Sequence, residues 1–137
     1  MFNPSKLKFK KEHKTTFKNK ENSPYKSSLL FGDCGLIATN KGVLFYKEIE
    51  AAKKTIAKKI KGVGLVFSRV HPNRPKTEKK KGMRMGKGKG SVGKWVVQIP
   101  SGTILFEVFG LFEEKYIKEV FKSTAVRLSI TTRNIFF

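Results

Sequence analysis

The sequence predicts an α+β domain in which two amphipathic helices pack on a mostly antiparallel sheet. Two segments repeat apolar side chains at helical spacing, and short segments rich in β-branched and aromatic residues surround them. Turn-forming residues join neighbouring strands closely, which favours antiparallel pairing. At 137 residues the chain is long enough for one domain with a real core, but not for two. We expect this domain to span residues 29–137, after a basic arm at residues 1–28.

Two short strands and a helix are the first predicted elements. Strand-like residues Leu36–Thr39 and Val43–Phe45 are joined by Asn40-Lys41-Gly42, a turn sequence. A helix is predicted from about Tyr46 to Lys61, where two nearby glycines end it. No polar residue suited to capping the helix start precedes Tyr46.

The first helix has one apolar and one cationic face. Its apolar face is formed by Ile49, Ala52, Ile56 and Ile60, and its opposite face by Lys47, Lys54, Lys58 and Lys61. The apolar face is expected to join the core. The lysine face is either a solvated surface or a second contact to phosphates, and the sequence leaves both interpretations open.

Three more strands and a second helix follow. Leu65–Val70, Trp95–Ile99 and Thr103–Val108 are predicted strands, and Pro100-Ser101-Gly102 between the last two predicts that they form an antiparallel hairpin. The second helix is predicted from about Glu113 to Leu128. Its inner face consists of Ile117, Val120, Phe121, Thr124 and Leu128. Ser129–Thr132 is the candidate for a final strand.

The charge of the chain predicts a polyanionic partner. The formal net charge is +20 and the sequence pI is about 10.3, so nucleic acid is the leading partner and an anionic membrane surface is its rival. No run approaches the roughly 18 apolar residues of a membrane span, so we expect no membrane insertion. A single cysteine and two histidines cannot form an intramolecular disulfide or a standard zinc site. No metal and no cofactor are therefore expected.

The arm at residues 1–28 carries eight lysines and two glutamates without a helical or strand period. Such a run is either a solvated tail or an arm that follows a phosphate backbone and folds on binding. We favour the second interpretation, because the chain has another basic block. The candidate phosphate contacts are Lys6, Lys8, Lys10, Lys11, His13 and Lys14.

The second basic block is a long loop at residues 71–94. Together with the two residues before it, it carries ten Lys or Arg side chains against one acid, Glu78. Ordering 24 backbone residues costs roughly 25–50 kcal/mol, whereas burying the three apolar side chains of the loop returns only about 2–3 kcal/mol each. We therefore expect a polyanionic partner to order the loop. Its candidate contacts are Arg69, Arg74, Lys76, Lys79, Lys80, Lys81, Lys87 and Lys89.

Gly88-Lys-Gly-Ser-Val-Gly93 matches the letters of a dinucleotide-binding fingerprint. We reject that interpretation, because a charged loop precedes the motif and a strand follows it, where a strand and a helix are required. In Arg84-Met-Gly-Lys-Gly-Lys-Gly90, glycines let the backbone approach a surface closely while alternating lysines neutralise phosphates. A flexible linker explains the glycines but not the regular cations.

No catalytic set of residues can be assembled from two histidines and one cysteine, so we expect no enzyme and no small-molecule substrate. Trp95 and the strand phenylalanines could stack on bases, but at these spacings they are more often core residues.

Five stretches of the chain resemble one family, the bacterial and organellar large-subunit ribosomal protein L-sixteen. They are Pro4–Lys14, Phe31–Leu36, Glu48–Lys54, Arg69–Lys79 with Arg84–Gly90 and Trp95, and Ile104–Gly110. The resemblance implies a hammerhead-type domain that packs on ribosomal RNA beside the cleft for aminoacyl-tRNA, with neighbouring ribosomal proteins as further partners. It also implies a structural constituent of the large subunit that helps to position tRNA during translation, and not an enzyme. A free RNA chaperone or ribosome assembly factor is the alternative.

The resemblance gives roles to the basic residues. The candidate phosphate contacts of the arm and the loop become contacts to large-subunit ribosomal RNA. The loop points toward the peptidyl transferase region, with Arg84 and Met85 at its tip. The residues implied to lie beside tRNA are Arg84, Met85, Gly86, Lys87, Gly88 and Lys89.

The chain departs from the family pattern at three places. Thr15–Tyr25 replaces a glycine-rich spacer, Lys80 replaces a common proline, and Phe45 replaces the polar cap of the first helix. Lysine outnumbers arginine 25 to 5. Together these features resemble mitochondrial members more than bacterial or plastid ones. Because the likeness begins at Pro4, no room is left for an import presequence, and we expect synthesis inside the organelle.

Overall fold

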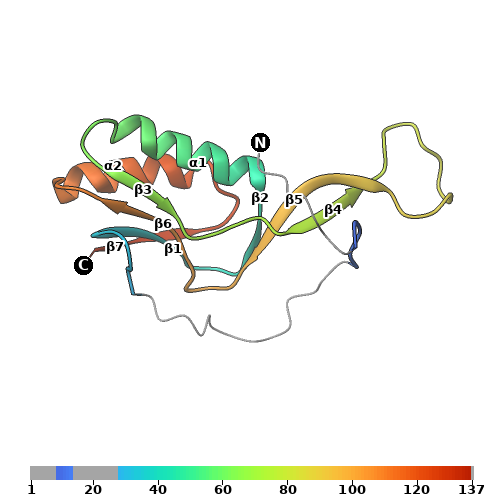
Figure 1. Ribbon diagram of the computed structural model, residues 1–137, viewed down its shortest axis with the longest axis horizontal. Helices are drawn as coiled ribbons and strands as arrows, with labels where there is room; N and C mark the ends of the chain where they lie inside the picture. Colours follow the sequence, from blue (N-terminus) through green and yellow to red (C-terminus); the bar gives the residue numbers. More distant parts are fainter. Residues whose placement is uncertain (1–8, 14–27, 137) are drawn as a thin grey trace.

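The computed structural model describes residues 9–13 and 28–136, and these residues form two helices and two sheets, arranged as in Figure 1. The predicted α+β class is confirmed. In chain order the elements are β1 (Cys34–Ala38), β2 (Gly42–Phe45), α1 (Tyr46–Lys59), β3 (Leu65–Ser68), β4 (Arg74–Glu78), β5 (Ser91–Ile99), β6 (Ile104–Phe109), α2 (Glu114–Ala125) and β7 (Thr132–Phe136). Predicted Lys6, Lys8 and Lys14 lie outside the described residues.

The strands form two antiparallel sheets. One has four strands in the order β3-β6-β1-β7, and the other has three in the order β2-β5-β4. The predicted hairpin between Trp95–Ile99 and Thr103–Val108 is therefore wrong, because β5 and β6 belong to different sheets.

The turn after β5 explains this difference. Gly102, at φ +80°, donates its N–H to the carbonyl of Ala38 at 2.8 Å, and the N–H of Ala38 donates to the carbonyl of Thr103 at 2.9 Å. The turn thus joins the end of β1 and passes the chain from one sheet to the other. A turn sequence defines how sharply the chain bends but not which strand it meets next.

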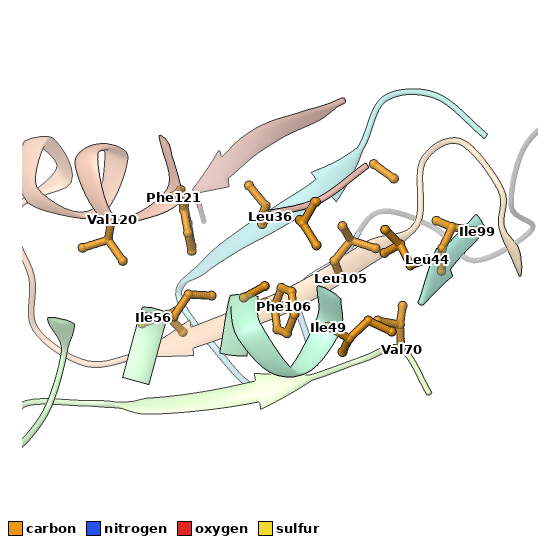
Figure 2. Close-up of a cluster of buried hydrophobic side chains, with 14 of the residues drawn as sticks. Leu36, Leu44, Ile49, Ile56, Val70, Ile99, Leu105, Phe106, Val120 and Phe121 are labelled. Carbon is orange, nitrogen blue, oxygen red and sulfur yellow. The ribbon is translucent and has the colours of Figure 1, made fainter. Parts of the chain in front are cut away.

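Both helices cover the same face of the four-stranded sheet (Figure 1). The buried side chains between them include Leu36 and Phe106 from the sheet, Ile56 from α1, and Phe121 from α2 (Figure 2). These are the positions that the helical periodicity predicts, so the apolar faces of both helices are confirmed as core.

The helix ends differ slightly from the predicted ones. α2 ends at Ala125, because Arg127 and Leu128 donate their N–H groups to residues three positions earlier in a tighter final turn. At the start of α1, Phe45 provides no side-chain cap; instead its N–H donates to Oε2 of Glu48 at 2.9 Å. Glu48 thus supplies one half of a capping box, and the half that a polar N-cap side chain would supply is absent here.

The last strand begins later than predicted, at Thr132 instead of Ser129. Residues 129–131 return the chain from α2, with the carbonyl of Thr131 accepting the N–H of Thr39 at 2.9 Å. β7 then pairs antiparallel with β1, from Ala38 opposite Thr132 to Cys34 opposite Phe136.

Candidate nucleic-acid interface

Strands β4 and β5 form a two-stranded ribbon that projects away from the helices and the four-stranded sheet (Figure 1). Arg74 lies opposite Val96, and Glu78 lies opposite Ser91. The prediction that residues 71–94 have no structure of their own is therefore wrong for the two strands. An antiparallel ladder satisfies the backbone by hydrogen bonds between the strands and does not require an apolar core of its own.

The base of the ribbon brings two lysines together. Lys76 lies directly opposite Lys94, a pairing that like charges disfavour. The Nζ atoms of these lysines lie 4.9 and 5.5 Å from the centre of the Phe45 ring, and Lys94 Nζ lies 3.1 Å from Oε1 of Glu78. The aromatic ring and the carboxylate offset the repulsion. Glu78, the one acid in residues 69–94, is thus already paired within the ribbon.

Beyond the strands, residues 79–90 form the distal loop, which closes the ribbon at its far end (Figure 1). Every side chain from residue 79 to residue 89 is exposed. The loop carries no acid and six cations, Lys79, Lys80, Lys81, Arg84, Lys87 and Lys89. A surface of this kind has the charge that a phosphate backbone requires.

The backbone of the distal loop depends on left-handed residues. Gly82, Gly86 and Gly88 have φ between +80° and +88°, and Lys87 between two of them has φ 57°. Nothing lies within 4 Å of where a Cβ would stand at these glycines, so their conformation and not crowding calls for glycine. Lys79 Nζ donates to the carbonyl of Gly86 at 3.1 Å and links the two sides of the loop.

The described part of the N-terminal arm lies against the distal loop. Lys11 Nζ donates to the carbonyl of Lys89 at 3.1 Å, and Lys89 Nζ donates to the carbonyl of Glu12. Lys10, Lys11 and His13 are exposed beside this contact. The structure therefore brings together two predicted basic segments that lie more than 70 residues apart in the sequence.

Arg69 has a different environment from the other predicted contacts. Its Nη1 pairs with Oε1 of Glu107, a carboxylate in β6 that is fully buried. Oε2 of Glu107 accepts the N–H groups of Leu30, Phe31 and Gly32 at 3.1, 2.6 and 3.2 Å. We call these groups the Glu107 clamp. The guanidinium of Arg69 also lies 5.5 Å from the centre of the Phe31 ring.

The Glu107 clamp was not predicted from the sequence. Its visible clue is a single acid in the otherwise apolar strand at residues 104–109. A buried carboxylate requires hydrogen-bond donors and a cation. The clamp anchors residues 30–32, which lead into β1, so Glu107 holds this segment and the residue after β3 together.

Within residues 9–13 and 28–136, no group of three or more His, Cys, Asp or Glu side chains is placed to hold a metal ion. The part of the chain that the structure describes also contains no helix long and apolar enough to span a membrane.

A small α+β body that presents an acid-free cationic loop is typical of proteins that are built into ribonucleoprotein particles. Comparisons with known proteins narrow this class. The family model described as ribosomal protein L16p/L10e matches residues 4–135. The chain belongs to this ribosomal protein family, as the resemblance predicted.

Individual relatives match almost end to end. The large ribosomal subunit protein uL16 of Aeromonas hydrophila subsp. hydrophila is 40% identical over 132 residues, which cover 96% of this chain and 94% of that protein. The proteins of the same name from Francisella tularensis subsp. novicida and Francisella philomiragia subsp. philomiragia are each 37% identical over the same shares of both chains.

Proposed function

We propose that this protein is a structural constituent of the large ribosomal subunit that binds ribosomal RNA through its distal loop and N-terminal arm. The relatives are named as proteins of the large ribosomal subunit. The observation that supports RNA as the ligand is the distal loop itself, which presents six cations and no acid and is contacted by Lys11 of the arm.

The ribbon acts as a rigid support for this contact. Strand pairing and the ring of Phe45 hold its base, so binding has to order only the side chains and the distal loop. Lysine ammonium groups act as mobile point charges and neutralise phosphates without a fixed geometry. Left-handed glycines keep backbone N–H groups open to phosphate oxygens as well.

We assign the phosphate contacts to Lys76, Lys79, Lys80, Lys81, Lys87, Lys89, Arg74, and the arm residues Lys6, Lys8, Lys10, Lys11, His13 and Lys14. Arg69 is left out, because its guanidinium pairs with the buried carboxylate of Glu107. A charge that is already paired inside the protein gains little from a phosphate.

The finer part of the proposal concerns tRNA. Arg84, Met85, Gly86, Lys87, Gly88 and Lys89 form the side of the distal loop that lies beside aminoacyl-tRNA near the peptidyl transferase region. Met85 is 91% exposed, so its whole side chain is accessible to a partner. A flexible thioether of this kind can pack against a nucleotide without a fixed geometry.

Sedimentation tests the proposal against its alternative. A constituent of the subunit co-sediments with mature large subunits at high magnesium and in equal amount. A free RNA chaperone or assembly factor is recovered in small amounts and only with immature particles. Consistent recovery free of RNA would contradict both functions.

A double variant tests the distal loop directly. Lys87→Ala with Lys89→Ala is expected to keep the fold and to weaken subunit assembly or tRNA accommodation, measured as translation rate at limiting magnesium. The matched control, Lys115→Ala with Lys122→Ala, removes two exposed lysines from α2 and should leave the rate unchanged. Equal rates for both variants would count against the proposed contact.

We also propose that the ribosome in question is mitochondrial. The support is compositional, a lysine to arginine ratio of 25 to 5 together with the departures at Thr15–Tyr25, Lys80 and Phe45. The relatives named above are bacterial. Mass spectrometry of ribosomes from purified mitochondria of the source organism should detect this chain, and its recovery with another class of ribosome would contradict the assignment.

A further inference from the structure

One end of the four-stranded sheet lies far from the distal loop, and four exposed apolar side chains gather there. Two come from the connections α1–β3 and β6–α2, which meet at this end, and the other two are the first residue of β3 and the last residue of β6 (Figure 1). Val63 is 62% exposed, Leu65 60%, Phe109 51% and Leu111 98%. We call these four residues the end patch.

The four residues form one surface. Leu65 lies directly opposite Phe109 in the pairing of β3 with β6. The two connections touch through backbone, since a Cβ added at Gly110 would lie 2.9 Å from the carbonyl of Val63 and 3.1 Å from the Cα of Gly64. The end patch is therefore continuous across both connections.

A packed support holds the end patch in place. The Phe112 ring stacks on Tyr116 with centroids 6.2 Å apart, and the hydroxyl of Tyr116 donates to the carbonyl of Lys59 at 2.6 Å. Gly64 has no room for a side chain, because a Cβ there would lie 2.7 Å from the Phe112 ring. The exposure of the end patch therefore belongs to a fixed surface.

The surroundings of the end patch are much less positive than the rest of the molecule. Residues 30–34, 59–65 and 109–115 carry three acids and three lysines, a net charge of 0 in a chain of net charge +20. Asp33 Oδ2 accepts the N–H of Gly110 at 3.4 Å, and Glu113 and Glu114 begin α2 beside Leu111. Glu114 is paired with Lys118, whereas Asp33 and Glu113 form no ion pair within the described residues.

This charge selects among the possible occupants. Two unpaired acids and no surplus of cations make this end a poor site for phosphates, so RNA is disfavoured here. A second copy of the chain would bring its own charge of +20 against the first. A basic protein segment with apolar side chains suits both the exposed apolar surface and the two unpaired acids, Asp33 and Glu113.

We propose that the end patch docks a basic segment of a neighbouring protein in the same particle, held by apolar contacts to Val63, Leu65, Phe109 and Leu111. The inference rests on the proposed function, which places the chain in a particle that contains other proteins. With four side chains, the end patch suits a short segment better than a whole domain. The two ends of the molecule then bind different partners: the distal loop binds RNA, and the end patch binds protein.

Site-specific photo-crosslinking in assembled large subunits tests the proposal. A photoreactive residue replaces Leu111 in one variant and Val126 in a control variant; Val126 is 83% exposed at the end of α2. We expect a crosslink from position 111 to a basic protein and none to that protein from position 126. Crosslinks from position 111 only to RNA, or to nothing, overturn the docking proposal.

Sedimentation measures whether the same variants are incorporated into the particle. This measurement distinguishes failure of the docking proposal from failure of the proposed function. A variant that co-sediments but does not crosslink to protein contradicts the end patch alone. A chain that stays outside the particle contradicts the proposed function and the docking inference with it. As a second measurement, Leu111→Ser should lower retention of the partner by about tenfold, the scale of one buried Leu contact, while Val126→Ser should not change it.

Discussion

Glu107 shows how one residue can join parts of the chain that are far apart in sequence. Its carboxylate is fully buried and accepts three backbone N–H groups in addition to the guanidinium of Arg69. Such a network is favourable only while every member is present, because any single loss leaves a charge or a donor unpaired beside the buried carboxylate. The clamp is therefore expected to be sensitive to single substitutions.

Glu107→Gln should lower the free energy of unfolding by about 3 kcal/mol, because Arg69 would lose its partner next to a buried site. Urea unfolding followed by circular dichroism measures the loss. The double variant Glu107→Gln with Arg69→Met is the matched control, and it should recover part of the stability because it removes both charges and keeps a side-chain oxygen that can accept the backbone N–H groups. A single variant as stable as the natural chain would contradict the clamp.

Cys34 provides a test of the local electrostatics near the end patch. Burial raises the pKa of the Cys34 thiol, and the charges of Asp33 and Glu114 raise it further. A raised pKa means less thiolate at a given pH, and the thiolate is the reactive form. At mildly alkaline pH, alkylation of Cys34 by iodoacetamide should therefore be slower than alkylation of a free cysteine peptide.

Asp33→Asn should speed this reaction, since it removes one of the charges that raise the pKa of Cys34. Intact-mass spectrometry over time gives both rates. Lys41→Gln changes an exposed charge on a different connection and serves as the control. Alkylation of the natural chain at the rate of the free peptide would show that the thiol is not in the environment described.

At the scale of single elements, the distal loop depends on the close approach of the ends of β4 and β5 that lead into it. A Cβ at Gly90 would lie 2.6 Å from the carbonyl of Glu78, a distance that real side chains do not reach. Gly90→Ala should thus separate the ends of β4 and β5 and speed hydrogen exchange of their amides. Gly82→Ala is the control, because a Cβ at that position has nothing within 4 Å. It should affect only the distal loop, at a cost of about 1 kcal/mol for the positive φ.

The elements differ in how well the sequence predicts them, and the difference has a physical cause. Both helices follow from local periodicity, and their buried faces are as predicted. Strand pairing is decided by contacts distant in sequence, so the sheet partners of β5 and β6 were not predictable from the turn between them. β4 has no apolar alternation at all, since its sequence is Arg-Pro-Lys-Thr-Glu, and it is a strand because β5 supplies its hydrogen bonds.

In the candidate nucleic-acid interface, too, local features are predictable from the sequence and contacts between distant residues are not. The cationic character of the distal loop is a property of composition and is visible in the sequence. The contact between Lys11 and Lys89 is not visible in the sequence, because it joins residues 78 positions apart. Arg69 was grouped with the phosphate contacts by its neighbours in sequence, whereas its partner Glu107 lies in another strand. Charge can be counted along a chain, but the partner of each charge depends on the fold.

At the scale of the whole molecule, the charges are distributed along its length. The distal loop and residues 9–13 beside it carry cations toward one end, and the end patch, with as many acids as lysines around it, lies at the other (Figure 1). A molecule of this kind is oriented by the field of an RNA surface before it makes contact. The cationic end is thus expected to approach RNA first and to leave the end patch accessible to protein.

This polarity predicts which lysines control the salt dependence of RNA binding. For the full chain and large-subunit RNA, Lys87→Ala with Lys89→Ala should lower the slope of log K against log salt by roughly 1.4–1.8, because each neutralised phosphate contributes about 0.7–0.9. Filter binding between 50 and 200 mM salt, about the range over which such effects are large, measures the slope. Lys115→Ala with Lys122→Ala changes the net charge by the same amount on α2, and its slope should equal that of the natural chain. If both pairs lowered the slope equally, total charge alone would govern binding and the distal loop would have no special role.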